Sequence, residues 1–235
     1  MKRTLLLSLV TLAIVAVSPA SAQKGGKATD APDKSTTGTA TDASATTTSP
    51  DIIILVHKPL YPFTVDLANG KTLPEKPIEY VKGGKLFRLE NESSKGIVDA
   101  NFDTLSKQID DAVKGQQKLT YPLKKSVVSD LLLDETKAVD KVWENRLYRL
   151  ASEEEVKVFD TNKAAAKAKL DKAYIDMQDP TYPYKKDPVS LVDLAGKETH
   201  KHLWGNKLVL FESAANAAEF DKNAETYLKI LETLK

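Results

Sequence analysis

A segment of about 61 residues occurs three times in succession in this chain, and this repetition limits the folds that it can adopt. A shift of the sequence by 61 positions aligns the runs 84–89, 145–150 and 206–211 without a gap. Tyr-Pro pairs recur at offsets of 60 and 61, so one residue has slipped near the start of the first copy. The copies are residues 51–117, 118–178 and 179–235, and their Tyr-Pro pairs begin at Tyr61, Tyr121 and Tyr182.

In each copy a two-residue turn separates two β-rich runs. Gly and Asn tolerate the positive φ that tight hairpin turns require, so this pattern predicts a β-hairpin. In the second copy the strands are expected over residues 139–143 and 146–150. The three turns are Gly83-Gly84, Glu144-Asn145 and Gly205-Asn206.

Two helices are expected after each hairpin. Residues that accept a hydrogen bond from a free backbone N–H make good helix N-caps. Ser152 and Glu155 also have the spacing of a capping box, which predicts a short helix through about Phe159. The expected caps are Asn91, Ser152 and Ser213 for a short helix and Asn101, Asn162 and Asn223 for a longer one with an apolar stripe.

The predicted fold class is therefore α+β, with three tandem repeats, each a β-hairpin followed by a short and a longer helix. A unit of about 60 residues is marginally stable without a disulfide or a metal. We therefore expect the three copies to pack on one another. Residues 52–56 are rich in Ile, and we predict an extra strand there at the start of the first copy.

The N-terminus has the order of a cleavable secretory signal. Lys2 and Arg3 precede an apolar run over residues 5–17, and small residues end at Ala22, where cleavage is expected. The apolar run is shorter than the roughly 20 residues of a membrane span. The prediction is a signal peptide (1–22), a disordered Thr/Ala/Ser-rich linker (23–50), a periplasmic or secreted protein and no membrane span after cleavage.

Composition excludes several kinds of site. The chain has no cysteine, which rules out disulfides, thiolate ligands and thiol nucleophiles. Loss of residues 1–22 removes two of 34 positive charges, and 32 against 33 leaves a net charge of about −1. Nucleic-acid binding depends on clustered Lys and Arg that neutralise phosphates, so no nucleic-acid partner is expected.

The order of Tyr-Pro, a short spacer, Val-Val-Ser, a hairpin and two capped helices resembles the YHS domain, a member of the TRASH-like metal-binding group. Residues 121–129 and 182–190 carry the resemblance best, and it extends over each copy. It implies a treble-clef-like or zinc-ribbon-like fold. In that family one cysteine follows the Tyr-Pro segment, and a Cys-Cys-x-x-Cys cluster follows the hairpin.

None of these cysteines is present here. The first position falls on Asp66 (or Val65, because of the slip), Ser126 and Asp187. Soft metals prefer thiolate and imidazole ligands, so the family's metal role does not carry over to these residues. The Cys-Cys-x-x-Cys cluster falls on Glu90, Asn91 and Ser94, on Ala151, Ser152 and Glu155, and on Glu212, Ser213 and Asn216.

Other candidate sites are few. His200 and His202 lie two residues apart on a predicted strand and could share a Cu, Ni or Zn ion, but two ligands fall short of the usual three or four. Oxygen ligands such as Asp187 and Glu212 lack calcium-loop spacing, so capping or solvation is the expected role. Trp143 and Trp204 are expected to pack on their hairpins.

No catalytic motif occurs, so the leading hypothesis is an exported non-enzymatic binding or structural protein that uses no cofactor. It would consist of three degenerate YHS-like modules that bind no metal, and its partner would be an unknown protein or small ligand. The alternative hypothesis is an extracytoplasmic metal-handling protein, a chaperone or sensor for Cu, Zn or Ni with His and carboxylate ligands in place of cysteines.

Overall fold

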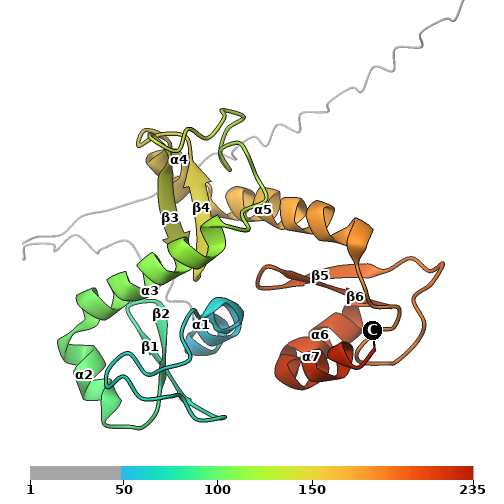
Figure 1. Cartoon of the computed structure of the whole chain (residues 1–235), viewed down its shortest axis with the longest axis horizontal. Coiled ribbons are helices and arrows are strands. Elements are labelled where there is room, and N and C mark those ends of the chain that lie inside the picture. The colour runs from blue at the N-terminus through green and yellow to red at the C-terminus, as the bar shows by residue number, and fades with distance from the viewer. Residues whose placement is uncertain (1–48, 235) are drawn as a thin grey trace, which may run out of the picture. The chain divides into compact units, whose positions relative to one another are not determined.

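The computed structural model describes residues 49–234. The predicted signal peptide (1–22) and linker residues 23–48 lie outside the described residues. All described residues fall within one compact unit, Thr46–Lys235. Over residues 49–234 the fold is mixed α/β, with seven α-helices and three two-stranded antiparallel sheets (Figure 1).

The three sheets are the predicted hairpins. Glu144 and Asn145 have φ of 54° and 52°, and Gly83 and Gly205 also have positive φ, as tight hairpin turns require. Each pair of strands is in register around its turn, with Tyr80 opposite Phe87 in the first. The strands are β1 (Ile78–Lys82) with β2 (Lys85–Leu89), β3 (Val139–Trp143) with β4 (Arg146–Leu150), and β5 (His200–Trp204) with β6 (Lys207–Phe211).

Two helices follow each hairpin, and Asn101, Asn162 and Asn223 stand at the N-cap position of the second helix as predicted, although their side chains make no capping hydrogen bond. The predicted stripe of α3 is buried, with Ile109 and Val113 fully inaccessible. The first copy contains α2 (Ser94–Ala100) and α3 (Phe102–Lys118), the second α4 (Glu155–Thr161) and α5 (Lys163–Gln178), and the third α6 (Ala214–Lys222) and α7 (Ala224–Glu232).

The first residues of the short helices differ from the prediction. Only Ser213 is a helix N-cap, and its Oγ accepts a hydrogen bond from the backbone N–H of Asn216. α4 begins at Glu155, three residues after the predicted cap Ser152. The Glu155 carboxylate accepts a hydrogen bond from the backbone N–H of Ala151, and this contact holds the residues between them in a turn.

The second helix of the third copy is not longer than the first, so that prediction was wrong. α6 and α7 have nine residues each.

The predicted strand over residues 52–56 was also wrong. This segment is helix α1 (Pro50–His57), followed by the short 3-10 helix η1 (Lys58–Leu60). The Ile-rich run favours a strand, but Pro50 at the first helical turn and the acidic Asp51 beside it favour a helix start. α1 lies against β1 and β2, and Ile53, Ile54 and Val56 are partly buried without a partner strand.

The helix before each hairpin supports it. α1 packs on β1 and β2, α3 on β3 and β4, and α5, followed by the 3-10 helix η2 (Asp179–Thr181), on β5 and β6. Leu147 of β4 is buried in the first core with Ile109 and Val113, and Leu203 of β5 packs against the second core. The copies therefore share apolar cores, as expected for units too small to be stable alone.

In the second and third copies the tyrosine of the Tyr-Pro pair binds the second strand of the hairpin. The hydroxyl oxygen of Tyr121 accepts a hydrogen bond from Arg149 N at 3.1 Å, and that of Tyr182 accepts one from Leu210 N at 3.1 Å. The hydroxyl of Tyr61 is buried without a hydrogen-bond partner. Burial raises the pKa of all three tyrosines to about 12, so they remain neutral across the physiological pH range.

A buried glutamine near the end of a long helix binds the next hairpin turn. The Nε2 of Gln117 donates to Asn145 O at 2.8 Å, and its Oε1 accepts from Leu147 N at 3.0 Å. Gln178 makes the same two bonds to Asn206 O and Leu208 N. These amides satisfy turn backbone groups that strand pairing leaves free.

The turn asparagines extend this contact to other parts of the chain. Asn145 Nδ2 donates to His57 O at 3.2 Å, and Asn206 Nδ2 donates to Gln117 Oε1 at 3.2 Å. His57, Gln117 and Asn145 are all more than nine-tenths buried. We call His57, Gln117, Asn145, Gln178 and Asn206 the amide junction.

Replacement of Gln117 by Leu should lower the free energy of unfolding by about 2–4 kcal/mol, because it leaves a buried carbonyl and a buried N–H without partners. The measurement is urea unfolding followed by circular dichroism. Gln116 is a matched control, since its amide binds Pro62 O at an exposed position and Gln116→Leu should cost under about 1 kcal/mol. Equal losses in the two variants would contradict the role of the amide junction.

Candidate functional site: three buried polar clusters

One polar residue after each Tyr-Pro pair is completely buried. Asp66, Ser126 and Asp187 each have 0% of their surface exposed. Each lies inside a short loop closed by an isolated bridge, Val65 with Thr72 in the first copy and Lys186 with Asp193 in the third. Of the two candidates for the first position, Asp66 is therefore the equivalent of Ser126 and Asp187.

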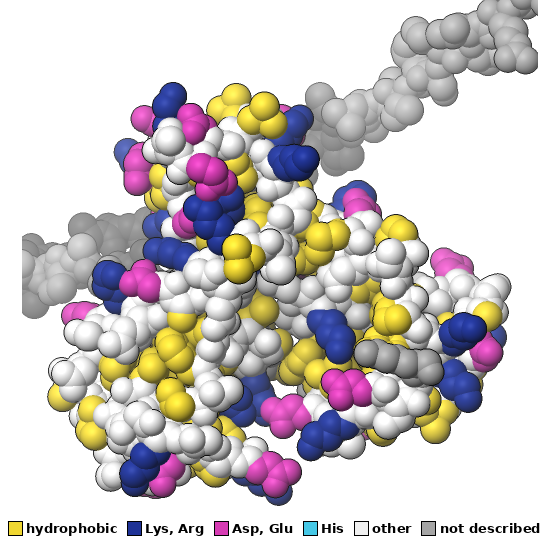
Figure 2. Space-filling view, in the orientation of Figure 1, with side chains coloured by type: hydrophobic (Ala, Val, Ile, Leu, Met, Phe, Trp, Pro, Cys, Tyr) yellow, Lys and Arg dark blue, Asp and Glu magenta, His cyan; other side chains and the backbone are white. Residues whose placement is uncertain are grey.

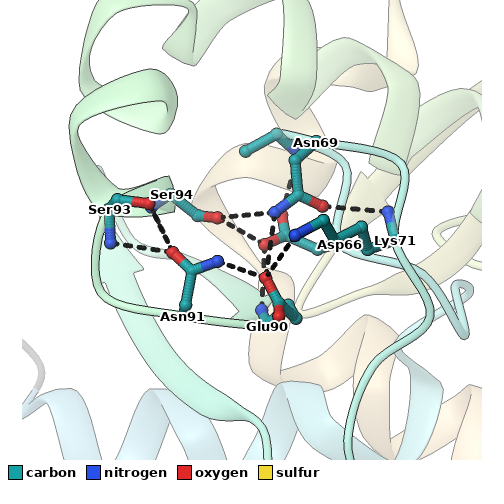
Figure 3. A network of polar contacts seen from close by, with 8 residues as sticks. Asp66, Asn69, Lys71, Glu90, Asn91, Ser93 and Ser94 are labelled. Atoms are coloured by element: carbon teal, nitrogen blue, oxygen red, sulfur yellow. Dashed lines mark hydrogen bonds and ion pairs between the residues drawn. The ribbon is translucent and has the colours of Figure 1, made fainter.

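In the first copy the carboxylate comes from the loop. Asp66 Oδ2 accepts hydrogen bonds from Ser94 Oγ at 2.6 Å and from the backbone N–H of Glu90 at 2.9 Å. Figure 3 shows these residues pointing toward one another, with Asn69 bridging the loop to the Ser94 hydroxyl at 3.2 Å. Asn91 lies between the turn and Glu90: its Oδ1 accepts from Ser93 N, and its Nδ2 donates to the Glu90 carboxylate.

In the second copy the carboxylate comes from the helix. Glu155 of α4 accepts hydrogen bonds from the hydroxyls of Ser126 and Ser129. It also accepts one from Ala151 N at 2.8 Å. Lys169 of α5 covers the loop by donating to the carbonyls of Ser126 and Ser129.

The third copy again has its carboxylate in the loop. Asp187 Oδ2 accepts from Asn216 Nδ2 at 2.7 Å and from Glu212 N at 2.8 Å. Its Oδ1 accepts from the backbone N–H groups of Val189 and Ser190. The carboxylate of Glu212 lies outside, near the exposed Ser190 hydroxyl and Lys197.

The three clusters share one arrangement despite their different residues. A single carboxylate accepts at least one side-chain hydrogen bond across the gap between loop and helix and one from the backbone just after the hairpin. The pairs across the gap are Asp66 with Ser94, Ser126 with Glu155, and Asp187 with Asn216. We call these the carboxylate clusters.

Hydrogen bonding favours the ionised form of Asp187 and Glu155. Burial alone would raise the pKa of Asp187, but the bonds from Asn216 and from three backbone N–H groups outweigh it, and the pKa lies below its ordinary value. The pKa of Glu155 is lowered for the same reason, against the effect of burial, by its serine partners and Ala151 N. Their stabilising effect is present above the ordinary carboxyl pKa and is lost as the pH falls through the folded value.

Of the twelve positions that match the family's cysteines, nine contribute to the clusters. Six contribute a side chain: Asp66, Ser94, Ser126, Glu155, Asp187 and Asn216. The other three, Glu90, Ala151 and Glu212, contribute a backbone N–H group. The side chains of Asn91, Ser152 and Ser213 lie on the adjoining turns, where Asn91 and Ser213 cap backbone groups.

The two histidines do not form a pair of equivalent ligands. His200 is exposed, whereas His202 is half-buried with Nε2 at 2.9 Å from Asp221 Oδ1 and its ring against Phe211 and Phe220. Among residues 49–234, no group of three or more His, Asp or Glu side chains is placed to hold a metal ion.

The tryptophans pack where the sequence places them. Trp143 contacts Tyr148 and Phe159, and Trp204 contacts Phe220 edge-on. Trp204 also lines a hollow of about 180 Å³ beside Leu55 and Leu60.

Sequence reasoning missed the amide junction, although its residues repeat in register. Gln117 and Gln178 stand four residues before Tyr121 and Tyr182, and Asn145 and Asn206 match at an offset of 61. A polar residue kept at one position in two copies was the available indication. Asn69, Ser129 and Lys169 were missed because each occurs in the contacts of one copy alone.

Comparison of the chain with known protein families, with curated proteins and with solved structures finds no match. Among the described helices, none combines the length and apolar character needed to cross a bilayer.

Exchange of the two cluster residues of the second copy for those of the first should restore the stability that each single exchange removes. Ser126→Asp alone places two carboxylates face to face in a buried site, and we expect a loss of about 3 kcal/mol or more. Glu155→Ser alone removes the acceptor of two hydroxyls and a backbone N–H. The double variant recreates the pairing of Asp66 with Ser94 and should lie within about 1.5 kcal/mol of the wild type.

The measurement is a double-mutant cycle from urea unfolding. We expect a coupling energy of at least about 2 kcal/mol in favour of the double variant. Additive losses would contradict the equivalence of the clusters.

Proposed function

We propose that this chain is an exported, non-enzymatic binding or structural protein made of three degenerate YHS-like modules that fold without metal. The observation that carries the proposal is the set of carboxylate clusters. At the positions where the resembled family has cysteines, this chain has one carboxylate whose acceptor sites are taken by donors of the protein itself.

This chemistry favours self-contained modules over metal centres. A metal ion needs several free lone pairs from converging ligands. Asp187 already accepts four hydrogen bonds, and its partner Asn216 uses its amide N–H₂ as a donor. An ion at this position would have to displace these bonds, whereas the bonds alone satisfy the buried charge.

The mixed charge of the surface favours a protein or small ligand as the partner over a polyanion. On the face shown in Figure 2, Lys and Arg side chains are intermixed with Asp and Glu. Many of them form ion pairs, including Lys58 with Glu225 and Lys201 with Asp179. A partner would meet small mixed-charge areas, and hollows of about 180, 420 and 740 Å³ adjoin α1 as candidate contact places.

Elemental analysis of the purified chain, joined to thermal unfolding with and without a strong chelator, tests the proposal. We expect less than about 0.1 equivalent of any transition metal and an unchanged Tm, because metal that stabilises a fold is lost to a chelator together with the stability. The samples are the wild type and a variant with His200→Ala and His202→Ala.

A stoichiometric metal, or a large drop in Tm with chelator, would contradict the metal-free proposal. Loss of that metal in the double histidine variant would favour the alternative, a metal-handling protein with imidazole and carboxylate ligands. In that case His202 would have to exchange its contact with Asp221 for the ion.

A further inference from the structure

Helix α1 is the least firmly packed of the helices that support a hairpin. His57 is its only buried residue, while Ile52 and Leu55 are 53% and 43% exposed. Three hollows adjoin it: Val56 lines the first and second, and Leu55 lines the first and third. A helix with open space on three sides loses little packing when it moves.

His57 occupies the position that glutamine occupies in the other two supporting helices. It stands four residues before Tyr61, as Gln117 and Gln178 stand four residues before their tyrosines. It lines the hollow of about 420 Å³ together with Gly83, Gly84 and Lys85 of the first hairpin turn. An amide at this place makes two bonds to the turn in the other copies, but the buried Nδ1 of His57 has no hydrogen-bond partner.

The supporting contact of α1 therefore depends on a buried neutral imidazole whose Nδ1 has no hydrogen-bond partner. We infer that α1 is an acid-released latch: protonation of His57 weakens its docking on the first hairpin and opens the hollows around it. This role goes beyond the proposed binding function and does not depend on it, since it concerns one titratable group and one helix.

The charges around His57 favour this direction. Burial, and to a lesser extent the nearby Lys85 ammonium, lower the pKa of His57 to about 4, while contact with the Asn145 side chain opposes the shift. Lys85 is itself paired with Asp110 of α3. Glu144 lines the same hollow and would attract an imidazolium, but burial raises its own pKa, so it loses charge as the pH falls.

The direction of the pH dependence follows from the linkage between protonation of His57 and docking of α1. A histidine whose pKa is lower when docked binds fewer protons in the docked state, so docking is strongest above the free pKa of 6.5 and weakens as the pH falls toward 4. At pH 5 the docking equilibrium should be roughly 30-fold weaker than at high pH.

The test is hydrogen exchange of the backbone amides of the chain from Gln23 onward at pH 7.5 and pH 5, corrected for intrinsic exchange rates. In the wild type, the protection of α1 amides should fall roughly 30-fold at pH 5, while that of α5 changes little. His57→Gln places the amide of Gln117 and Gln178 at this position and should reduce the change in α1 to under about 3-fold. A control with His200→Gln and His202→Gln should keep the wild-type response.

Two results would overturn the latch. One is α1 protection that falls no more than that of α5 in the wild type, and the other is a His57→Gln variant that keeps the acid response. If His57→Gln fails to fold, an NMR titration of the wild-type imidazoles decides the matter. The latch requires a His57 pKa well below the ordinary value of 6.5, and a His57 pKa near 6.5 would contradict it.

Discussion

The side chain of Gln117 holds together parts of the chain that are too small to be stable alone. One amide binds the carbonyl of Asn145, the N–H of Leu147 and the side chain of Asn206, so it contacts both later hairpins from the end of α3. Each bond adds only about 1 kcal/mol net. Without Gln117, the buried backbone groups of the turn would have no hydrogen-bond partners. The free-energy cost of leaving them unpaired exceeds the net gain from the bonds themselves. Leu147 can enter the first core because the turn beside it is satisfied.

The carboxylate clusters apply the same rule to charge. A buried carboxylate is tolerated when donors surround it, and each copy supplies one carboxylate with donors from the loop, the helix and the backbone. The rule does not fix which element carries the charge. In the second copy the charge lies on α4 and the hydroxyl on the loop, the reverse of the first copy. A resemblance based on cysteine positions therefore retains geometric meaning even where no ligand type is retained.

Local and repeated features of this fold could be predicted from the sequence. The turn at Glu144-Asn145 and the start of α3 at Asn101 depend on backbone preferences within a few residues, and these are visible in each copy. α1 could not be predicted in this way, because its Ile-rich run suits a strand and its helical state depends on packing against β1 and β2. The clusters were indicated by position only. Whether Asp66 or Val65 faced inward, and which atoms met, depended on contacts between residues more than 20 positions apart.

The differences among copies show where the fold is strict. The tyrosine of the Tyr-Pro pair and the asparagine that precedes the second helix are the same in all three. The residue at the end of the supporting helix differs: it is glutamine in two copies and His57 in the first. His57 lies on α1, and among the described residues no complete copy precedes this helix. Gln117 and Gln178 bond a turn from helices that also carry a core of their own, whereas α1 has no such core. The imidazole of His57, which makes fewer hydrogen bonds than the glutamine amides, therefore lies on the supporting helix that is least firmly packed. The docking of α1 on the first hairpin is accordingly the contact between elements that is easiest to break.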